Sequence, residues 1–147
     1  MNNRLALQQF NKAYENDALE VAVYGASPVG LIVLLYEGAI KALVQAKVFM
    51  GQNRYQEKSA MISRAQDILE GLRVSLDHDK GKDISVNLED LYQYSKYRLG
   101  VANLNNDANI IDEISNLLSI LLPAWQELDR RPKATEQAGS EQEKARV

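Results

Sequence analysis

The sequence predicts an all-α protein, an antiparallel four-helix bundle, and three observations support this fold class. Helix breakers are scarce, with 3 Pro and 8 Gly among 147 residues. Apolar residues recur at three- and four-residue intervals over four long segments, which is the spacing of one helix face. The links between these segments are short and polar, as between antiparallel neighbours in a bundle. The length is that of one domain with a substantial core.

The first long helix is expected over residues 27–50, SPVGLIVLLYEGAIKALVQAKVFM. Ser27 is suited to cap the free N–H groups of the first turn, Pro28 fits the first helical position, and Gly51 follows the last apolar residue. One apolar face suits the core. A second apolar face lies roughly opposite, where a solvated helix should carry polar residues, and it consists of Val33, Tyr36, Ile40, Val44 and Val48. Something must cover this second face.

The second and third helices follow after short polar segments. The turn at 51–53 leads into a helix predicted over residues 54–76, which is amphipathic. The stretch 77–83, DHDKGKD, is expected to be a loop because it is too polar for the core. A third helix is predicted from residue 85 or 87 to 103, with Leu88 and Leu99 in its core stripe. Its second, partly aromatic face contains Tyr94, Tyr97, Val101 and Leu104.

The fourth helix should begin after a turn at residues 105–107 and end near residue 131. Asp107 or Asn109 can cap its first turn. Its apolar stripe is regular except at Pro123, which has no N–H and whose ring presses on the carbonyl group of Ser119. We therefore predict a kink there, or a helix that stops near Leu122 and restarts.

The two ends of the chain show no such regular pattern. Residues 1–26 mix helical and alternating spacings, so they are either a frayed terminus or a strap whose Phe10 and Tyr14 rest on the first long helix. Residues 132–147 have no apolar periodicity and are predicted to be a disordered tail. The expected organisation is a strap or short helix at 1–26, a bundle at 27–131 and the tail.

Composition excludes several classes of function. The formal net charge of −3 argues against binding to nucleic acid or to an anionic membrane, which both require a basic surface. There is no Cys, which fits a reducing compartment. The N-terminus has no signal-peptide pattern, and the longest apolar run, residues 29–36, is shorter than the about 20 residues of a membrane span. We expect a cytoplasmic protein with no membrane insertion.

Catalytic or metal-binding patterns are not found in the sequence. The single histidine, His78, has no Glu three residues before it and stands in an acidic loop at a helix end, so we expect a solvated side chain. A histidine phosphotransfer bundle is an alternative, but its histidine should lie mid-helix. The neighbouring acids Glu89-Asp90 and Asp112-Glu113 are attributed to the dipole at the start of their helices. No enzyme activity and no cofactor are predicted.

The second apolar faces indicate binding of some kind. Apolar grooves of this type accept a partner helix. The same surface could pair two copies of the chain with two-fold symmetry, as in a homodimeric helical adaptor, and the residues alone leave both interpretations open.

Three stretches carry a family resemblance through their order and spacing. The sequence ASP at residues 26–28 is followed by LIVLLYEGAIKAL, similar to A-S-P and then L-x-x-x-L-Y-[DE]-G-A-I/L. The sequence NLEDLYQYSKYRLGVANLNND from Asn87 is similar to N-L-x-x-L-Y-x-Y-x-x-x-x-L-x-x-A-N-x-x-N-D, and Ala124-Trp125 follows near the end of the last helix. Together, over residues 14–128, they resemble the flagellar secretion chaperone family FliS.

The resemblance implies a four-helix bundle that binds the C-terminal segment of flagellin in the cytoplasm. Such a chaperone blocks premature polymerisation and presents the subunit to the export apparatus, while its N-terminal segment lies over part of the binding surface when no client is bound. Tyr14 resembles the tyrosine of that segment. The candidate partner-binding residues are Tyr14, Val33, Tyr36, Ile40, Val44, Tyr94, Tyr97, Val101 and Asn103. Burial against a neighbouring helix stays open for the apolar ones, and a turn or cap role for Asn103.

Overall fold

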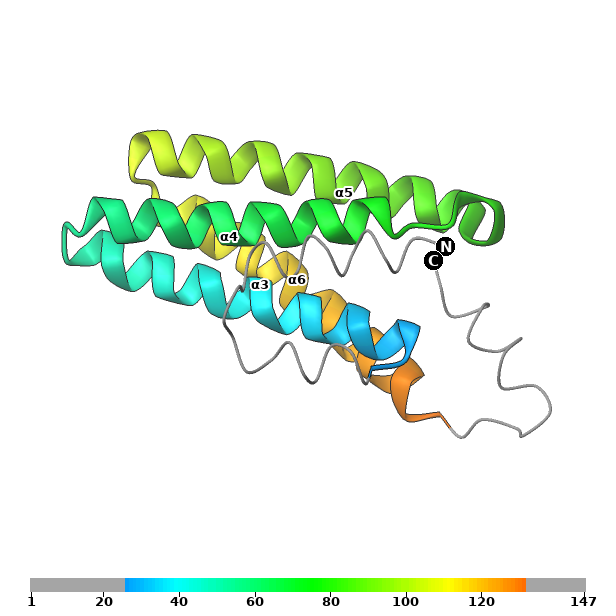
Figure 1. The fold of residues 1–147 in the computed structure, drawn as a ribbon. Coiled ribbons are helices and arrows are strands. Elements are labelled where there is room, and N and C mark those ends of the chain that lie inside the picture. Colours follow the sequence, from blue (N-terminus) through cyan, green and yellow to red (C-terminus); the bar gives the residue numbers. More distant parts are fainter. Residues whose placement is uncertain (1–25, 132–147) are drawn as a thin grey trace.

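The computed structural model describes residues 26–131, which form four helices. In chain order these are α3 (Pro28–Gly51), α4 (Tyr55–Val74), α5 (His78–Asn105) and α6 (Ala108–Arg130). Helices adjacent in the chain run antiparallel (Figure 1). Each of α3 and α5 packs against both α4 and α6, so α3 and α5 lie across the diagonal of the bundle. The predicted fold class is confirmed, whereas the predicted strap, apart from Ala26, and the tail lie outside the described residues.

The start of α3 follows the predicted chemistry. The Ser27 hydroxyl accepts a hydrogen bond from the N–H group of Gly30 at 3.0 Å, and Pro28 occupies the first turn. The same hydroxyl donates to Asp129 of α6 at 3.2 Å. The cap therefore fixes the first turn of α3 and also joins it to the far end of α6.

The core is a continuous cluster to which all four helices contribute. Leu35 and Leu99 are completely buried and Leu88 is 9% exposed, which confirms the predicted core stripes. Helix α3 is long and apolar enough to cross a membrane by length and composition, but 56% of the relevant window is buried inside the bundle. This burial is typical of a core helix.

The prediction of a loop over residues 77–83 is wrong in part. Asp77 caps a helical turn by accepting a hydrogen bond from the Lys80 N–H group at 3.2 Å, and Gly81 N–H donates to the Asp77 carbonyl at 2.7 Å. The buried Ser85 hydroxyl donates to the same carbonyl at 3.1 Å. The helix is interrupted only at Lys82, with φ 48° and ψ −120°. These bonds of Asp77 and Ser85 stabilise a helical turn although the segment is polar.

The turn between α5 and α6 is held by a buried lysine. Asn106 adopts a left-handed conformation with φ 52°, and the Asp107 N–H donates to the Ala102 carbonyl at 3.0 Å. The Lys58 side chain from α4 is 3% exposed and donates to the Asn103 carbonyl at 2.9 Å and to Asn106 Oδ1 at 2.7 Å. Burial lowers the pKa of Lys58. Its ammonium group neutralises the negative end of the α5 dipole.

Helix α6 continues through Pro123, so of the two predicted alternatives the stop near Leu122 is wrong and the kink stays a prediction. Asp107 caps this helix by accepting a hydrogen bond from the Asn109 N–H at 3.0 Å. Pro123 and Ser119 both lie on the exposed side of α6. A proline on this side costs less than one facing the core, because the carbonyl group that loses its donor is not buried among apolar side chains.

We predict that replacing Lys82 with Gly stabilises the bundle. A side chain in this backbone conformation is strained, and glycine lacks the Cβ atom that causes the strain. Glycine also has more conformational entropy in the unfolded chain, which offsets part of the relieved strain. The expected net gain in the free energy of unfolding is therefore about 1 kcal/mol. Chemical denaturation measures it. The control is Lys82→Ala, which keeps the Cβ atom; an equal gain from both variants would contradict a backbone origin.

Candidate partner-binding surface

The second face of α3 is partly covered by its neighbours and partly exposed. Val33 and Ile40 are half-buried and pack against the core. Val44 and Val48, one helical turn apart near the end of α3, are 55% and 52% exposed. The exposed part of the predicted face is therefore its C-terminal half.

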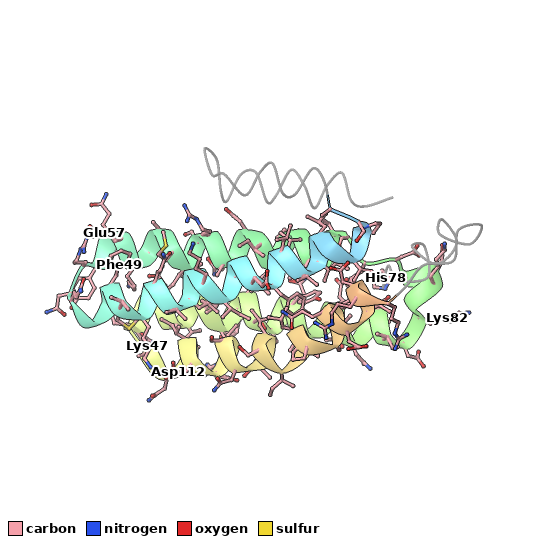
Figure 2. The ribbon with its side chains drawn as sticks, turned by 90° about the horizontal axis from the view of Figure 1, so that it is seen from below. Lys47, Phe49, Glu57, His78, Lys82 and Asp112 are labelled. Atoms are coloured by element: carbon pink, nitrogen blue, oxygen red, sulfur yellow. The ribbon has the colours of Figure 1, made fainter. Side chains whose placement is uncertain are left out.

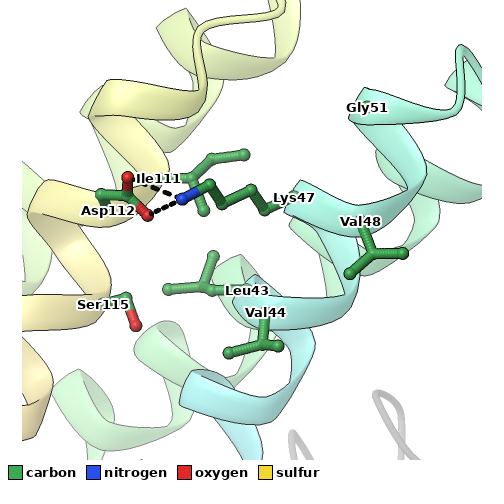
Figure 3. A pocket seen from close by; sticks show the side chains of 8 residues that line it. All are labelled: Leu43, Val44, Lys47, Val48, Gly51, Ile111, Asp112 and Ser115. Atoms are coloured by element: carbon green, nitrogen blue, oxygen red, sulfur yellow. Dashed lines mark hydrogen bonds and ion pairs between the residues drawn. The ribbon is translucent and has the colours of Figure 1, made fainter.

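A groove of about 460 Å³ lies beside these two valines, between α3 and α6 (Figure 3). Leu43 and Ile111 line it and are buried themselves. The complete lining consists of Leu43, Val44, Lys47, Val48, Gly51, Ile111, Asp112 and Ser115. Lys47 Nζ lies 2.9 Å from both carboxylate oxygens of Asp112, and this pair bridges the two helices. The groove thus combines apolar surface with one half-exposed ion pair.

The acidic pair on α6 does not serve the helix dipole as predicted. The first turn of α6 contains no acidic residue. Asp112 faces Lys47 of α3, whereas Glu113 accepts a hydrogen bond from the Tyr94 hydroxyl and lies 3.6 Å from Nε of Arg98, both on α5. Successive residues point in different directions on a helix, so each carboxylate ties α6 to a different neighbour.

The outer side of α5 carries a second exposed apolar stripe. Tyr97 is 70% exposed, Leu104 82% and Tyr94 43%, while Val101 is half-buried. The hydrogen bond to Glu113 raises the pKa of Tyr94. Three of these four residues were predicted to contact a partner, and Leu104 belongs to the same sequence pattern. Its high exposure adds it to the candidate surface.

Tyr36 lies in the core and not on the candidate surface. It is fully buried, and its hydroxyl oxygen lies 2.7 Å from that of the buried Tyr92 on α5. Its ring also contacts Trp125 of α6, with ring centroids 6.3 Å apart. Burial raises the pKa of Tyr36 and raises that of Tyr92 well above 10.0. Tyr36 therefore offers no exposed area to a partner. Its burial is tolerated because its hydroxyl group has a hydrogen-bond partner inside the bundle.

Asn103 is engaged within the turn that follows α5. Its side-chain oxygen accepts a hydrogen bond from the Ser59 hydroxyl at 2.9 Å, and its carbonyl accepts one from Lys58. These bonds support the structural alternative for Asn103. Tyr14 lies outside the described residues.

The side of the bundle where α4 meets α5 carries a network of charges. Glu70 lies 2.6 Å from both Arg73 and Lys96, and Arg73 lies 3.4 Å from Glu89. His78 Nε2 lies 3.3 Å from Glu89 (Figure 2 shows His78 near the start of α5). The predicted role of Glu89 at a helix start is wrong, because α5 begins at His78 and Glu89 lies within the helix beside Arg73 and His78. His78 is at the N-terminal end of α5, not in a loop after α4.

Residues 26–131 contain no group of three or more His, Cys, Asp or Glu side chains placed to hold a metal ion. The features that distinguish this part of the chain are its exposed apolar faces. A binding surface is therefore the candidate site.

Comparison with known families identifies the chain. The family model described as "Flagellar protein FliS" matches residues 10–132. The chain belongs to the FliS family. A relative from Salmonella typhimurium, the flagellar secretion chaperone FliS, is 43% identical over 125 residues, which cover 84% of this chain and 91% of the relative. The FliS of Escherichia coli K12 is 40% identical over 117 residues, or 79% of this chain and 86% of that protein.

More distant FliS proteins match a similar extent of the chain. FliS of Bacillus subtilis is 24% identical over 123 residues, covering 84% of this chain and 88% of the relative. The FliS match therefore includes all four helices, and the predicted family resemblance is confirmed.

We predict strong coupling between Tyr36 and Tyr92. Replacing either with Phe leaves the other hydroxyl buried without its partner, so each single variant should lose about 1 to 3 kcal/mol of stability. The double Phe variant should lose less than the sum, because no orphaned hydroxyl of this pair remains. Denaturation of all four proteins gives the coupling free energy, and additive losses would contradict a shared hydrogen bond.

We predict an acid-sensitive contribution from Glu70. The bonds from Arg73, and next those from Lys96, lower the pKa of Glu70 from 4.5 to about 2. A carboxyl group with a lowered pKa in the folded state stabilises the fold above its ordinary pKa, and this contribution disappears as the pH falls from 4.5 toward 2.

Glu70→Gln should therefore cost roughly 1 to 3 kcal/mol at pH 7, and the cost should shrink steadily below pH 4.5. Urea denaturation at several pH values measures the difference between the two proteins. The half-exposed Glu57→Gln is a control with a smaller expected effect. A pH-independent loss from Glu70→Gln would exclude the proposed ionic origin.

Proposed function

We propose that this protein is a cytoplasmic export chaperone that binds the C-terminal segment of flagellin. Bound to that segment, it prevents premature polymerisation and presents the subunit to the export apparatus. Membership in the FliS family supports a chaperone role, and the relatives are named flagellar secretion chaperones. The chemistry of the surface supports a polypeptide client.

The observation that carries this proposal is the position of the two exposed apolar faces. One lies on α3 at Val44 and Val48, and the other on α5 at Tyr97 and Leu104. Because α3 and α5 are diagonal helices, the two faces lie on different sides of the bundle. A compact partner on one side cannot contact both. A long, initially unstructured segment can wrap around the bundle and cover them together.

The energetics favour such a segment. Ordering a disordered client has a large entropic cost, which extensive apolar burial at about 25 cal/mol per Å² can offset. The valines beside the α3–α6 groove suit an amphipathic helix whose apolar residues recur at helical spacing. Residues of the client near Lys47 and Asp112 must then be polar or leave this ion pair intact.

The phosphotransfer alternative receives no support from the surroundings of His78. This histidine is the first residue of α5 and lies 3.3 Å from Glu89, whereas a phosphotransfer histidine should lie in the middle of a helix on a solvated face. Self-association would use the same apolar surface as a client. It predicts a dimer that flagellin does not dissociate.

We predict that Val44→Glu and Tyr97→Glu each weaken flagellin binding at least tenfold, since each places a charge in an apolar interface. Both side chains are exposed, so the helical content measured by circular dichroism should be unchanged. The matched control is Ser63→Glu on the exposed side of α4.

Co-purification with full-length flagellin, and with flagellin that lacks its C-terminal segment, measures binding directly. Only the full-length form should be captured. Equal capture of both forms, or of neither, would contradict the proposal. Light scattering of the chain with and without flagellin distinguishes a stable dimer from a client complex.

A further inference from the structure

The floor of the α3–α6 groove is apolar and closed to water. Leu43 of α3 and Ile111 of α6 line the groove, yet they are 0% and 1% exposed. Lys47 follows Leu43 by one helical turn on the same face of α3. It reaches across the groove to Asp112 of α6 (Figure 3), with its ammonium group 2.9 Å from both carboxylate oxygens. The ion pair and the hydrocarbon stem of Lys47 therefore cover the floor.

The Lys47–Asp112 ion pair is a weak contact between the two helices. Its side chains are 50% and 46% exposed, and among residues 26–131 each has only the other as a hydrogen-bonding partner. Half-exposed ion pairs contribute little to stability, because water competes for both charges. The buried contact of Tyr36 with Trp125 also joins α3 to α6. Opening of the ion pair therefore leaves the two helices in place.

The groove has room for a side chain beside this ion pair. Its volume is about 460 Å³, and it is lined in part by Gly51, where an added Cβ atom would meet no neighbouring group within 4 Å. A large apolar side chain that enters reaches the floor only if the stem of Lys47 moves aside. Burial of such a side chain stabilises more than a half-exposed ion pair does, so the exchange is favourable.

We propose that Lys47 is a lid on the α3–α6 groove. Without a client its side chain lies across the groove on Asp112. When an apolar side chain of the client enters, the lid swings out into water and uncovers Leu43 and Ile111. The two charges stay at the rim of the groove, so the client residues beside the apolar one are polar, and one of them accepts a hydrogen bond from the freed ammonium group.

Lys47 is thus a specificity-determining residue, because it selects an apolar side chain with polar neighbours. The inference rests on the proposed function, since the occupant of the groove is the C-terminal segment of flagellin.

Thiol reactivity measures opening of the lid without any client. The chain contains no Cys, so Leu43→Cys places a single thiol under the lid. Asp112→Ala removes the partner of Lys47. In the double variant the thiol should react with a soluble disulfide reagent at least tenfold faster than in Leu43→Cys alone. Ile111→Cys is a second reporter of the same floor, and circular dichroism verifies that each variant is folded.

The matched control for Asp112→Ala is Glu57→Ala, which removes the same charge. The Arg54–Glu57 ion pair has the same length, 2.9 Å, and the same exposures, 50% and 46%, but it lies at the start of α4 and bridges no groove. Glu57→Ala should leave the reactivity of the thiol unchanged. Equal reactivity in the Asp112→Ala and Glu57→Ala backgrounds would overturn the lid.

Flagellin binding tests the role of the lid in client recognition. Asp112→Ala should associate with full-length flagellin about three- to tenfold faster than the unmodified protein in stopped-flow measurements. This advantage should shrink as NaCl is added, because salt weakens the ion pair of the unmodified protein. An ion pair that the client leaves intact predicts no gain, or a loss, from the same substitution.

The outcomes separate this inference from the proposed function. If the unmodified protein does not bind flagellin, the proposed function fails, while thiol reactivity still decides whether Lys47 is a lid. If flagellin binds, and Asp112→Ala does not associate faster, only the role of the lid in client recognition is overturned.

Discussion

The hydrogen bond between Tyr36 and Tyr92 is the constraint on which the bundle depends. It joins diagonal helices that otherwise contact each other little, and it satisfies two polar atoms in an apolar interior. Apolar side chains tolerate small shifts of one helix along another, but a buried hydroxyl pair does not, because a shift leaves both groups without a partner. Trp125 packs on Tyr36 and brings α6 to the same point. One polar contact thus relates the positions of three helices.

The surface of the bundle is charged where α4 meets α5 and mainly uncharged along most of α6. Where α4 meets α5, Glu70 and Glu89 together balance Arg73 and Lys96, and these contacts hold the two helices together. Helix α6 instead uses single carboxylates near its start, with Asp112 toward α3 and Glu113 toward α5, and is uncharged from residue 114 to 126. The proposed client surface on α3 therefore lies beside a single ion pair, Lys47 with Asp112, and not beside a network of charges.

The periodicity of apolar residues was sufficient to predict four helices and their core stripes, because burial imposes that spacing directly. The spacing could not assign Tyr36, since a tyrosine suits either a solvated face or a core that offers a partner for its hydroxyl. The polarity of segment 77–83 wrongly predicts a loop. Asp77 is a residue type that caps helices, but the burial of Ser85 depends on tertiary packing, which the local sequence does not show. The partners of Asp112 and Glu113 also lie on other helices, so the local sequence around these acids could not predict them.

The buried Lys58 links segments that meet only after the chain has reversed direction between α4 and α5. Its ammonium group lies at the α5–α6 corner, 45 residues away along the chain, and it is bound by neutral oxygens. The corner thus acquires its geometry only once α4 and α5 have paired. Helix α6, although diagonal to α4, receives its direction from a side chain of that helix. The direction of α6 at this corner therefore depends on the pairing of α4 with α5, two helices that are consecutive in the chain.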